Sequence, residues 1–156
     1  MKKFKLVILI LIMVVAIGVI VLFVTMRQVS NKKPITEQEF AELLSNYNIE
    51  ATDISGTIQT PIVERLLVGK VDGFHAELYL CSSDDTAKAL FNENKESMKI
   101  SAGSYSVLSL GNYGRCKLTT GDKFYYLARI DNTILLVYSF NSDKENVLKL
   151  ASEMGY

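Results

Sequence analysis

A long apolar run near the start of the chain constrains its fold more than any other feature. Every residue from Leu6 to Val24 is apolar or glycine, and the run extends to Met26. At a rise of 1.5 Å per residue, about 20 such residues match the roughly 30 Å hydrocarbon core of a bilayer, which a single segment crosses only as a helix. A secretory signal has an apolar region of only about 7–15 residues before a small-x-small cleavage site. The small-x-small triplet here, residues 16–18, lies in the middle of the run. We therefore expect residues 1–26 to form an uncleaved membrane anchor.

Charge is divided unequally along the chain. Residues 1–33 contain six basic and no acidic side chains, whereas residues 34–156 contain 11 basic and 17 acidic ones, a net charge of −6. An acidic domain is unsuited to nucleic acid, because proteins that bind nucleic acid present basic surfaces. Three basic residues, Lys2, Lys3 and Lys5, precede the apolar run. We therefore expect a cytoplasmic N-terminus and a C-terminal domain on the outer side of the cell membrane.

A short linker and a clearly marked helix follow the anchor. Residues 27–34 are polar and lack periodicity, which indicates a juxtamembrane linker over residues 27–35 before a domain over residues 36–156. Thr36 and Glu39 have the spacing of a capping box at the start of a helix. The apolar positions after them recur at helical spacing, and this periodicity predicts a helix that ends at Asn46–Asn48.

Strand patterns fill most of the remaining domain. Turn residues such as Asp72-Gly73 and Asp131-Asn132 separate runs with β-strand composition. Strands are predicted at Ile62–Gly69, Phe74–Cys81, Tyr105–Leu110, Arg115–Thr120, Lys123–Asp131 and Thr133–Phe140. The segment Thr52–Ser55 has the pattern of a further short strand. A second helix is expected after Ser82–Asp85, whose side chains suit an N-cap and a first turn.

A third helix is predicted near the end of the sequence, from Ser142 to Met154. Ser142 and Glu145 have the spacing of another capping box, and Gly155 suits the position after the helix. The expected fold is an N-terminal transmembrane helix followed by an α+β domain. In that domain an antiparallel sheet of about six strands packs with three helices, in the order α-β-β-α-β-β-β-β-α.

Four segments resemble a group of small extracytoplasmic domains of Gram-positive bacteria. They read TEQEFAELL, ELYLCSSDDTAKALF, GNYGRCKLTTGDKFYYLARIDNTILLVYSF and LASEMGY, and the resemblance covers essentially residues 34–156. Members of this group typically follow a single N-terminal membrane anchor or a lipid signal. The resemblance implies a location and an α+β fold, and it transfers no catalytic residue.

The residues that carry chemistry form no recognisable device. His75 is the only histidine, so every nucleophilic mechanism that uses an imidazole base depends on it. Its predicted place in mid-strand beside Glu77 favours a solvated or locally hydrogen-bonded side chain. The histidine, cysteines and carboxylates lack metal-ligand spacing, and Asp84-Asp85 suits the first turn of a helix. The sequence therefore predicts no catalytic site, no metal and no cofactor.

The two cysteines leave two interpretations open. An extracytoplasmic setting permits a disulfide between Cys81 and Cys116. Strand alternation, however, places Cys116 with Leu118 on an apolar face and Cys81 with Glu77 on the opposite face of its own strand. This difference in faces favours two separate small hydrophobic side chains over a disulfide. A twist at the end of a strand could still bring the two cysteines to the same face.

The last predicted hairpin is apolar on both faces. A two-residue turn at Asp131-Asn132 pairs Ala128 with Leu135 and Tyr126 with Val137 on one face. The opposite face carries Tyr125, Leu127, Ile134, Leu136 and Tyr138. Antiparallel strands with one solvated face alternate apolar and polar residues, and these do not. Either helices cover both faces, which the sequence favours, or the second face is an exposed binding surface with its tyrosines as anchors.

These observations favour a non-enzymatic role. We expect a single-pass membrane protein whose small domain binds a protein or cell-envelope partner. One alternative is a cell-envelope hydrolase that uses His75 or carboxylates. The other is a small accessory or immunity-type membrane protein that acts through its transmembrane helix, although that helix has no GxxxG motif.

Overall fold

The computed structural model describes residues 13–20, 32–58 and 60–156. Residues 13–20 are helical and exposed. Within these ranges, no helix has both the length and the apolar character needed to cross a bilayer. Most of the anchor predicted over residues 1–26 lies outside the described residues.

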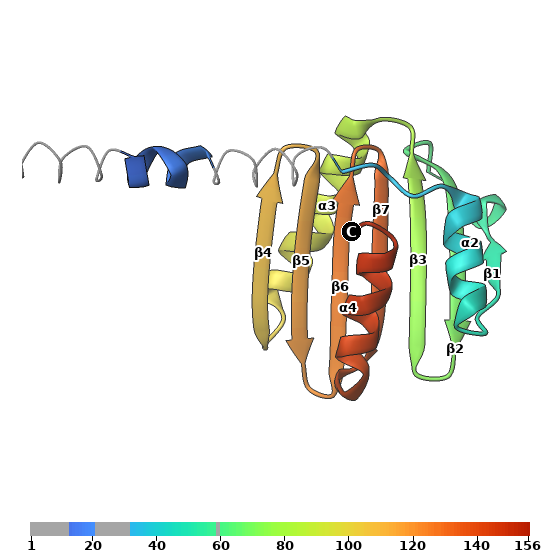
Figure 1. Cartoon of the computed structure of the whole chain (residues 1–156). Helices are drawn as coiled ribbons and strands as arrows, with labels where there is room; N and C mark the ends of the chain where they lie inside the picture. Colours follow the sequence, from blue (N-terminus) through green and yellow to red (C-terminus); the bar gives the residue numbers. More distant parts are fainter. Residues whose placement is uncertain (1–12, 21–31, 59) are drawn as a thin grey trace, which may run out of the picture.

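One antiparallel sheet forms the body of the domain, with its strands in the order β1-β2-β3-β7-β6-β5-β4 (Figure 1). The seven strands are β1 (Ala51–Asp53), β2 (Val63–Val71), β3 (Phe74–Cys81), β4 (Ser104–Leu110), β5 (Tyr113–Thr120), β6 (Lys123–Ile130) and β7 (Thr133–Phe140). The α+β class predicted from the sequence is confirmed. The predicted count of about six strands and the predicted order omit β1. The further short strand expected at Thr52–Ser55 does form as β1, one residue earlier at its start and two residues shorter at its end.

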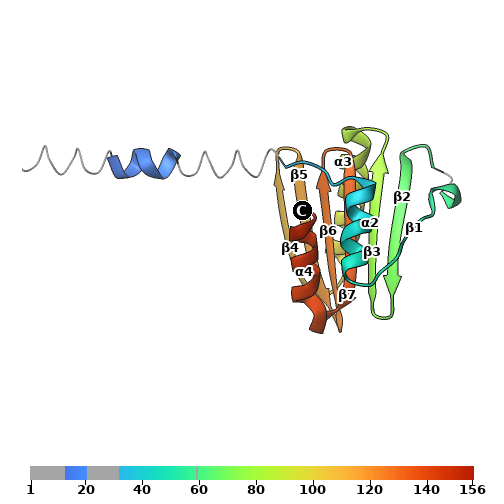
Figure 2. The ribbon, with the colours of Figure 1, turned by 45° about the vertical axis from the view of Figure 1, so that its right-hand side comes forward.

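Helices cover both faces of this sheet (Figures 1 and 2). α2 (Glu37–Asn46) and α4 (Lys144–Glu153) lie on one face, and α3 (Asp84–Ile100) lies on the other. We call these the α2/α4 face and the α3 face. Because successive residues of a strand point to opposite faces, each strand contributes side chains to two separate cores.

Each face has its own buried cluster. The cluster beneath α2 and α4 is the larger one, and Phe40, Leu44, Phe124 and Leu135 are among its fully buried side chains. The cluster beneath α3 consists of Cys81, Ala87, Phe91, Cys116, Leu127 and Ile134. A sheet with cores on both sides explains why β6 and β7 lack the alternation of strands that face water on one side.

Local sequence signals correctly predict the start of α2 and the last hairpin. The Glu39 amide donates to Thr36 Oγ1 at 3.2 Å, and the Thr36 amide donates to Glu39 Oε2 at 2.8 Å, which completes the predicted capping box. The β6–β7 register pairs Tyr126 with Val137 and continues through the two-residue turn, as predicted.

The predicted start of the last helix is wrong. Residues Asn141–Asp143 form a short 3-10 turn, η2, and α4 begins at Lys144. Ser142 lies inside this turn and therefore cannot cap the helix, and no side chain caps α4 at its N-cap residue, Asp143. The other end agrees with the prediction. Gly155 has a φ of +83°, and the next amide, that of Tyr156, donates to the Ala151 carbonyl at 2.8 Å.

Candidate functional site

The α3 face is only partly covered by its helix. Among the five residues that the sequence singled out as a binding surface, Leu127 and Ile134 are 1% exposed and lie beneath α3. Tyr125, Leu136 and Tyr138 are half-buried. The sequence left open whether this face is covered or exposed. In the structure two of the five residues are covered and three are partly exposed.

Beyond the covered area, aromatic rings from three neighbouring strands form a row. His75 of β3 is paired with Tyr138 of β7, which is paired with Tyr125 of β6. The His75 and Tyr138 rings stack, with centroids 4.6 Å apart and planes 16° apart. The Tyr125 and Tyr138 centroids are 5.4 Å apart, with planes inclined by 31°. We call these three residues, together with Glu77 and Leu136, the aromatic strip.

Glu77 fixes the position of one end of the aromatic strip. Its Oε1 lies 2.5 Å from Nε2 of His75, and its Oε2 accepts a hydrogen bond from the Tyr79 hydroxyl. The side chains of His75 and Glu77 are 13% and 17% exposed. Nδ1 of His75 is buried and has no hydrogen-bond partner among the residues that the structure describes. The imidazole is therefore held by one local contact and one stacked ring.

This geometry is suited to non-covalent binding. In the described part of the chain, His75 hydrogen-bonds to Glu77 alone, so it has no serine, threonine or cysteine to activate. Burial raises the pKa of the Tyr79 hydroxyl, and the hydrogen bond to Glu77 raises it further. Burial also raises the pKa of Tyr138, and the negative charge of Glu77 adds to this shift. Both phenols therefore stay neutral, as apolar surfaces with a polar end.

Hollows border the aromatic strip on two sides. One, of about 320 Å³, lies between the C-terminal half of α3 and the sheet, and Met98, Leu118 and Tyr125 are among its lining residues. The other, of about 260 Å³, is lined in part by His75 and Tyr138. Rings that stand between two hollows offer a partner both flat contact area and places for its side chains.

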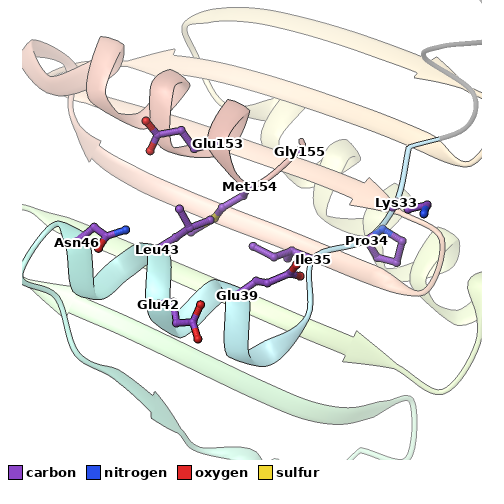
Figure 3. A pocket seen from close by; sticks show the side chains of 10 residues that line it. All are labelled: Lys33, Pro34, Ile35, Glu39, Glu42, Leu43, Asn46, Glu153, Met154 and Gly155. Carbon is purple, nitrogen blue, oxygen red and sulfur yellow. The ribbon is translucent and has the colours of Figure 1, made fainter.

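A third hollow lies between α2 and α4 on the opposite face of the sheet (Figure 3). It has a volume of about 340 Å³, and Leu43 of α2 and Met154 lie on facing sides of it. Its three carboxylates belong to Glu39, Glu42 and Glu153. Each of them already accepts a hydrogen bond, from Thr36, Gln38 and Tyr47 respectively. Within the described residues no group of three metal-ligating side chains occurs, so we do not place a metal site here.

The parity argument for the cysteines was wrong, because both lie on the α3 face. Cys81 and Cys116 belong to the same buried cluster and are free thiols. β7 and β6 separate their strands, and three strand spacings of about 4.8 Å amount to about 14 Å. A disulfide needs Cα atoms about 4.4–6.8 Å apart, so the fold does not allow this bridge.

Sequence reasoning missed the contribution of β3 to the site. It placed His75 beside Glu77 on a polar face, and it did not connect them with Tyr138. The connection depends on the pairing of β3 with β7, which are separated in the chain by α3 and three strands. The absence of charged residues from both faces of β7 was the one sequence signal that this strand lies inside a sheet.

The comparisons with known proteins give no family. No protein-family model matches the chain, and no curated protein matches it. A crystal structure of a GTP binding regulator from Thermotoga maritima is similar to it, with a TM-score of 0.48 and 17% sequence identity. The match covers 77% of this chain and 87% of that chain. A similarity of this size supports no argument about function.

Proposed function

We propose that the chain is a single-pass protein of the cell membrane whose extracytoplasmic domain binds a protein or cell-envelope partner. In this proposal the domain is non-enzymatic, and the aromatic strip is the surface that contacts the partner. The observation that carries the proposal is the place of Tyr138, which stacks on His75 and lies beside Tyr125, half-buried, on the α3 face of the sheet.

The composition of the strip supports a binding role. Tyrosine is enriched where proteins bind one another, because it combines a large rigid ring with a polar end. Tyr125, Leu136 and Tyr138 are each half-buried, so they are held in place by the domain and still accessible. Glu77 fixes His75, and this contact reduces the loss of side-chain freedom on binding.

The apolar run at residues 6–24 supports the membrane location, through its length and its lack of charge. Lys32 is the first described residue after the apolar run, and it is attached to the folded domain. Its carbonyl accepts a hydrogen bond from Asn112 Nδ2 at 2.8 Å, and its Nζ donates to the Gly155 carbonyl at 2.5 Å. The chain therefore enters the domain at a defined place, and an anchor would hold the domain by that end.

Photo-crosslinking tests the partner surface in the full-length chain. A benzophenone amino acid replaces Tyr138 in one variant and Gln38 in a control variant. Gln38 is exposed and lies on α2, on the other face of the sheet. We expect a light-dependent adduct of defined mass from position 138 alone, and a weaker one when the same chain carries Tyr125→Ala. Equal labelling from both positions, or no adduct from position 138, would contradict the proposal.

Protease treatment of intact cells tests the location and the orientation separately. We expect external protease to remove the folded domain and to leave a membrane-bound fragment that contains residues 6–26. Full protection of the domain would refute the orientation. Recovery of mature protein in the medium, with a new N-terminus beyond residue 26, would refute the anchor.

A further inference from the structure

Part of the α2/α4 face has no helix over it. α4 lies over β6 and β7 and α2 lies toward β2 and β3, so the edge strand β4 and the part of β5 that follows Tyr113 are bare on this side (Figure 1). Arg115 and Lys117 alternate along β5 and point to this bare area, because their cross-strand partners Ala128 and Tyr126 belong to the core beneath α4. Lys144, at the start of α4, borders the same area.

Lys32 completes a group of four cations, Lys32, Arg115, Lys117 and Lys144, which we call the basic strip. None of the four makes a salt bridge within the described residues. Residues 34–156 carry a net charge of −6, so unpaired cations are not a consequence of composition. Like charges that gather without acidic partners weaken the fold, which suggests that they serve a ligand.

The pKa shifts of two members agree with this crowding. Burial lowers the pKa of Lys32, and the positive charge of Arg115 lowers it further. Burial also lowers the pKa of Lys117, and Arg115 and Lys144 act in the same direction. Glu145, in the first turn of α4, acts on Lys117 in the opposite direction without forming a salt bridge with it.

Aromatic rings hold three of these cations in fixed places. Nζ of Lys32 lies 4.4 Å from the centre of the Tyr113 ring, and that of Lys117 lies 5.9 Å from the centre of the Tyr126 ring. Nζ of Lys144 lies 5.5 Å from the centre of the Phe124 ring. A cation over a ring keeps its charge exposed while its carbon chain is ordered. The strip therefore presents several ordered positive charges to one side of the domain.

The position of Lys32 indicates what this side faces. Lys32 is six residues after Met26, and six extended residues span at most about 20 Å. If residues 6–26 are in the bilayer, the Lys32 end of the basic strip lies within about 20 Å of the lipid surface. Lys144 lies at the other end of α4, so the whole strip reaches the surface only if this face of the sheet turns toward it. The aromatic strip is on the opposite face of the sheet, so it would point away from a lipid surface that the basic strip contacts.

We propose that the basic strip, formed by Lys32, Arg115, Lys117 and Lys144 on the bare part of the α2/α4 face, docks the domain onto the anionic phospholipid headgroups of the membrane that holds its anchor. The proposal rests on the anchor in the proposed function. It assigns the two faces of the sheet different tasks, because one face contacts lipid phosphates and the other stays free for a partner.

The test uses the full-length chain in vesicles of phosphatidylcholine alone or of equal parts phosphatidylcholine and phosphatidylglycerol. The sequence has no tryptophan, so Leu108→Trp supplies a single reporter on β4, at a position that is 39% exposed and paired with Arg115. Headgroup-labelled quencher lipid reports the approach of this tryptophan to the surface. We expect stronger quenching in the anionic vesicles and a loss of that difference at high salt.

Two double variants in the same background separate the strip from total charge. Arg115→Gln with Lys117→Gln should abolish the difference between the two lipids. Lys70→Gln with Lys123→Gln removes the same charge from exposed positions on the α3 face and should preserve it. Persistence of the difference in the first pair, or its loss in the second, would overturn the proposal. Circular dichroism spectra of the two pairs serve as a check on folding.

The remaining outcomes distinguish the anchor from the docking. Failure of the chain to stay with neutral vesicles in alkaline carbonate would refute the anchor, and the docking proposal would fail with it. An anchored chain with equal quenching in both lipids would refute the docking alone. If inorganic phosphate releases the reporter more than chloride does at the same ionic strength, the strip binds free phosphate and the lipid proposal is wrong.

Discussion

Tyr138 stacks on His75 with ring centroids 4.6 Å apart, and this contact joins β7 to β3 on the α3 face. It covers the imidazole that Glu77 holds by Nε2. The same ring is therefore a part of the fold and of the proposed binding surface, so its two roles have to be measured separately.

We expect His75 and Tyr138 to be energetically coupled. Contacts between rings in such geometry contribute about 0.5–1.5 kcal/mol beyond the area that they bury. A double-mutant cycle with His75→Ala and Tyr138→Ala, measured by urea unfolding, should give a coupling free energy in that range. A matched cycle that pairs Tyr138→Ala with the distant Thr36→Ala should be additive. Additivity in the first cycle as well would show that the stacking does not stabilise the fold.

Local patterns predicted most elements of this domain. The bounds of β3 and β7 agree with the prediction, because a turn follows or precedes a run of alternating residues at each end. The register of the β6–β7 hairpin was also predictable, since a two-residue turn fixes which residues face each other. Each of these signals lies within a few residues of the structure that it specifies.

The parts that failed depend on contacts between distant segments. Nothing near His75 in the sequence shows that β3 pairs with β7, so the polar face of β3 could not be matched with the tyrosine face of the last hairpin. The same gap produced the wrong parity for Cys81 relative to Cys116. When helices cover both faces of a sheet, the pattern of apolar residues does not show which face of one strand lies on the same side of the sheet as a given face of another strand.

Thr36 and Ser142 should respond differently to alanine, although their sequence patterns are alike. Thr36 Oγ1 accepts from the Glu39 amide at 3.2 Å, so Thr36→Ala should lower the free energy of unfolding by about 1 kcal/mol. Ser142 lies in the η2 turn and caps no helix, so Ser142→Ala should change it by less than about 0.5 kcal/mol. Urea unfolding of both variants measures this. A similar loss in both would mean that α4 begins where the sequence predicted.

Gly69 should not tolerate a side chain. A Cβ at this position would overlap Cδ1 of Leu44 and lie 3.0 Å from Cγ2 of Ile49, both in the core beneath α2. Gly69→Ala should therefore destabilise the fold by about 1–3 kcal/mol through overpacking. Gly56→Ala is the matched control, because no atom lies within 4 Å of its Cβ, and it should be neutral or slightly stabilising. Equal effects in thermal unfolding would contradict the close packing of α2 on β2.

Both thiols should be unreactive in the folded chain. Burial, followed by the negative charge of Glu64, raises the pKa of Cys81 to about 11, and burial also raises the pKa of Cys116. At mildly alkaline pH roughly one Cys81 thiol in 10³ is ionised, and the thiolate is the form that iodoacetamide attacks. We expect mass spectrometry to find no alkylation before unfolding and two alkylated cysteines after it, with or without reductant. Dependence on reductant would reveal a disulfide that the fold does not allow.

Tyr156 should make the fold sensitive to alkali. Its hydroxyl lies 2.5 Å from Thr133 Oγ1, which donates to the Ile130 carbonyl at 2.7 Å, so the tyrosine is the donor in this buried pair. Burial raises the pKa of Tyr156 well above its ordinary value, and the negative charge of Asp131 adds to the shift. A group whose pKa is higher in the folded state than in the unfolded state contributes stability that is complete below the unfolded pKa. This contribution is therefore present up to about pH 10 and declines as the pH rises further.

Tyr156→Phe separates this effect from the rest of the core. At neutral pH the variant loses a buried hydrogen bond and should be less stable by about 1 kcal/mol. Above about pH 10 the wild-type chain must ionise a buried phenol or unfold, whereas the variant has no phenol at this position, so the difference between them should shrink and then reverse. Urea unfolding from neutral pH to about pH 11 follows the difference directly. Tyr79 and Tyr126, whose pKa values burial also raises, remain in both proteins, so both should still lose stability in alkali. A constant difference across this range would show that Tyr156 titrates alike in the folded and unfolded chain, which its burial at 6% exposure argues against.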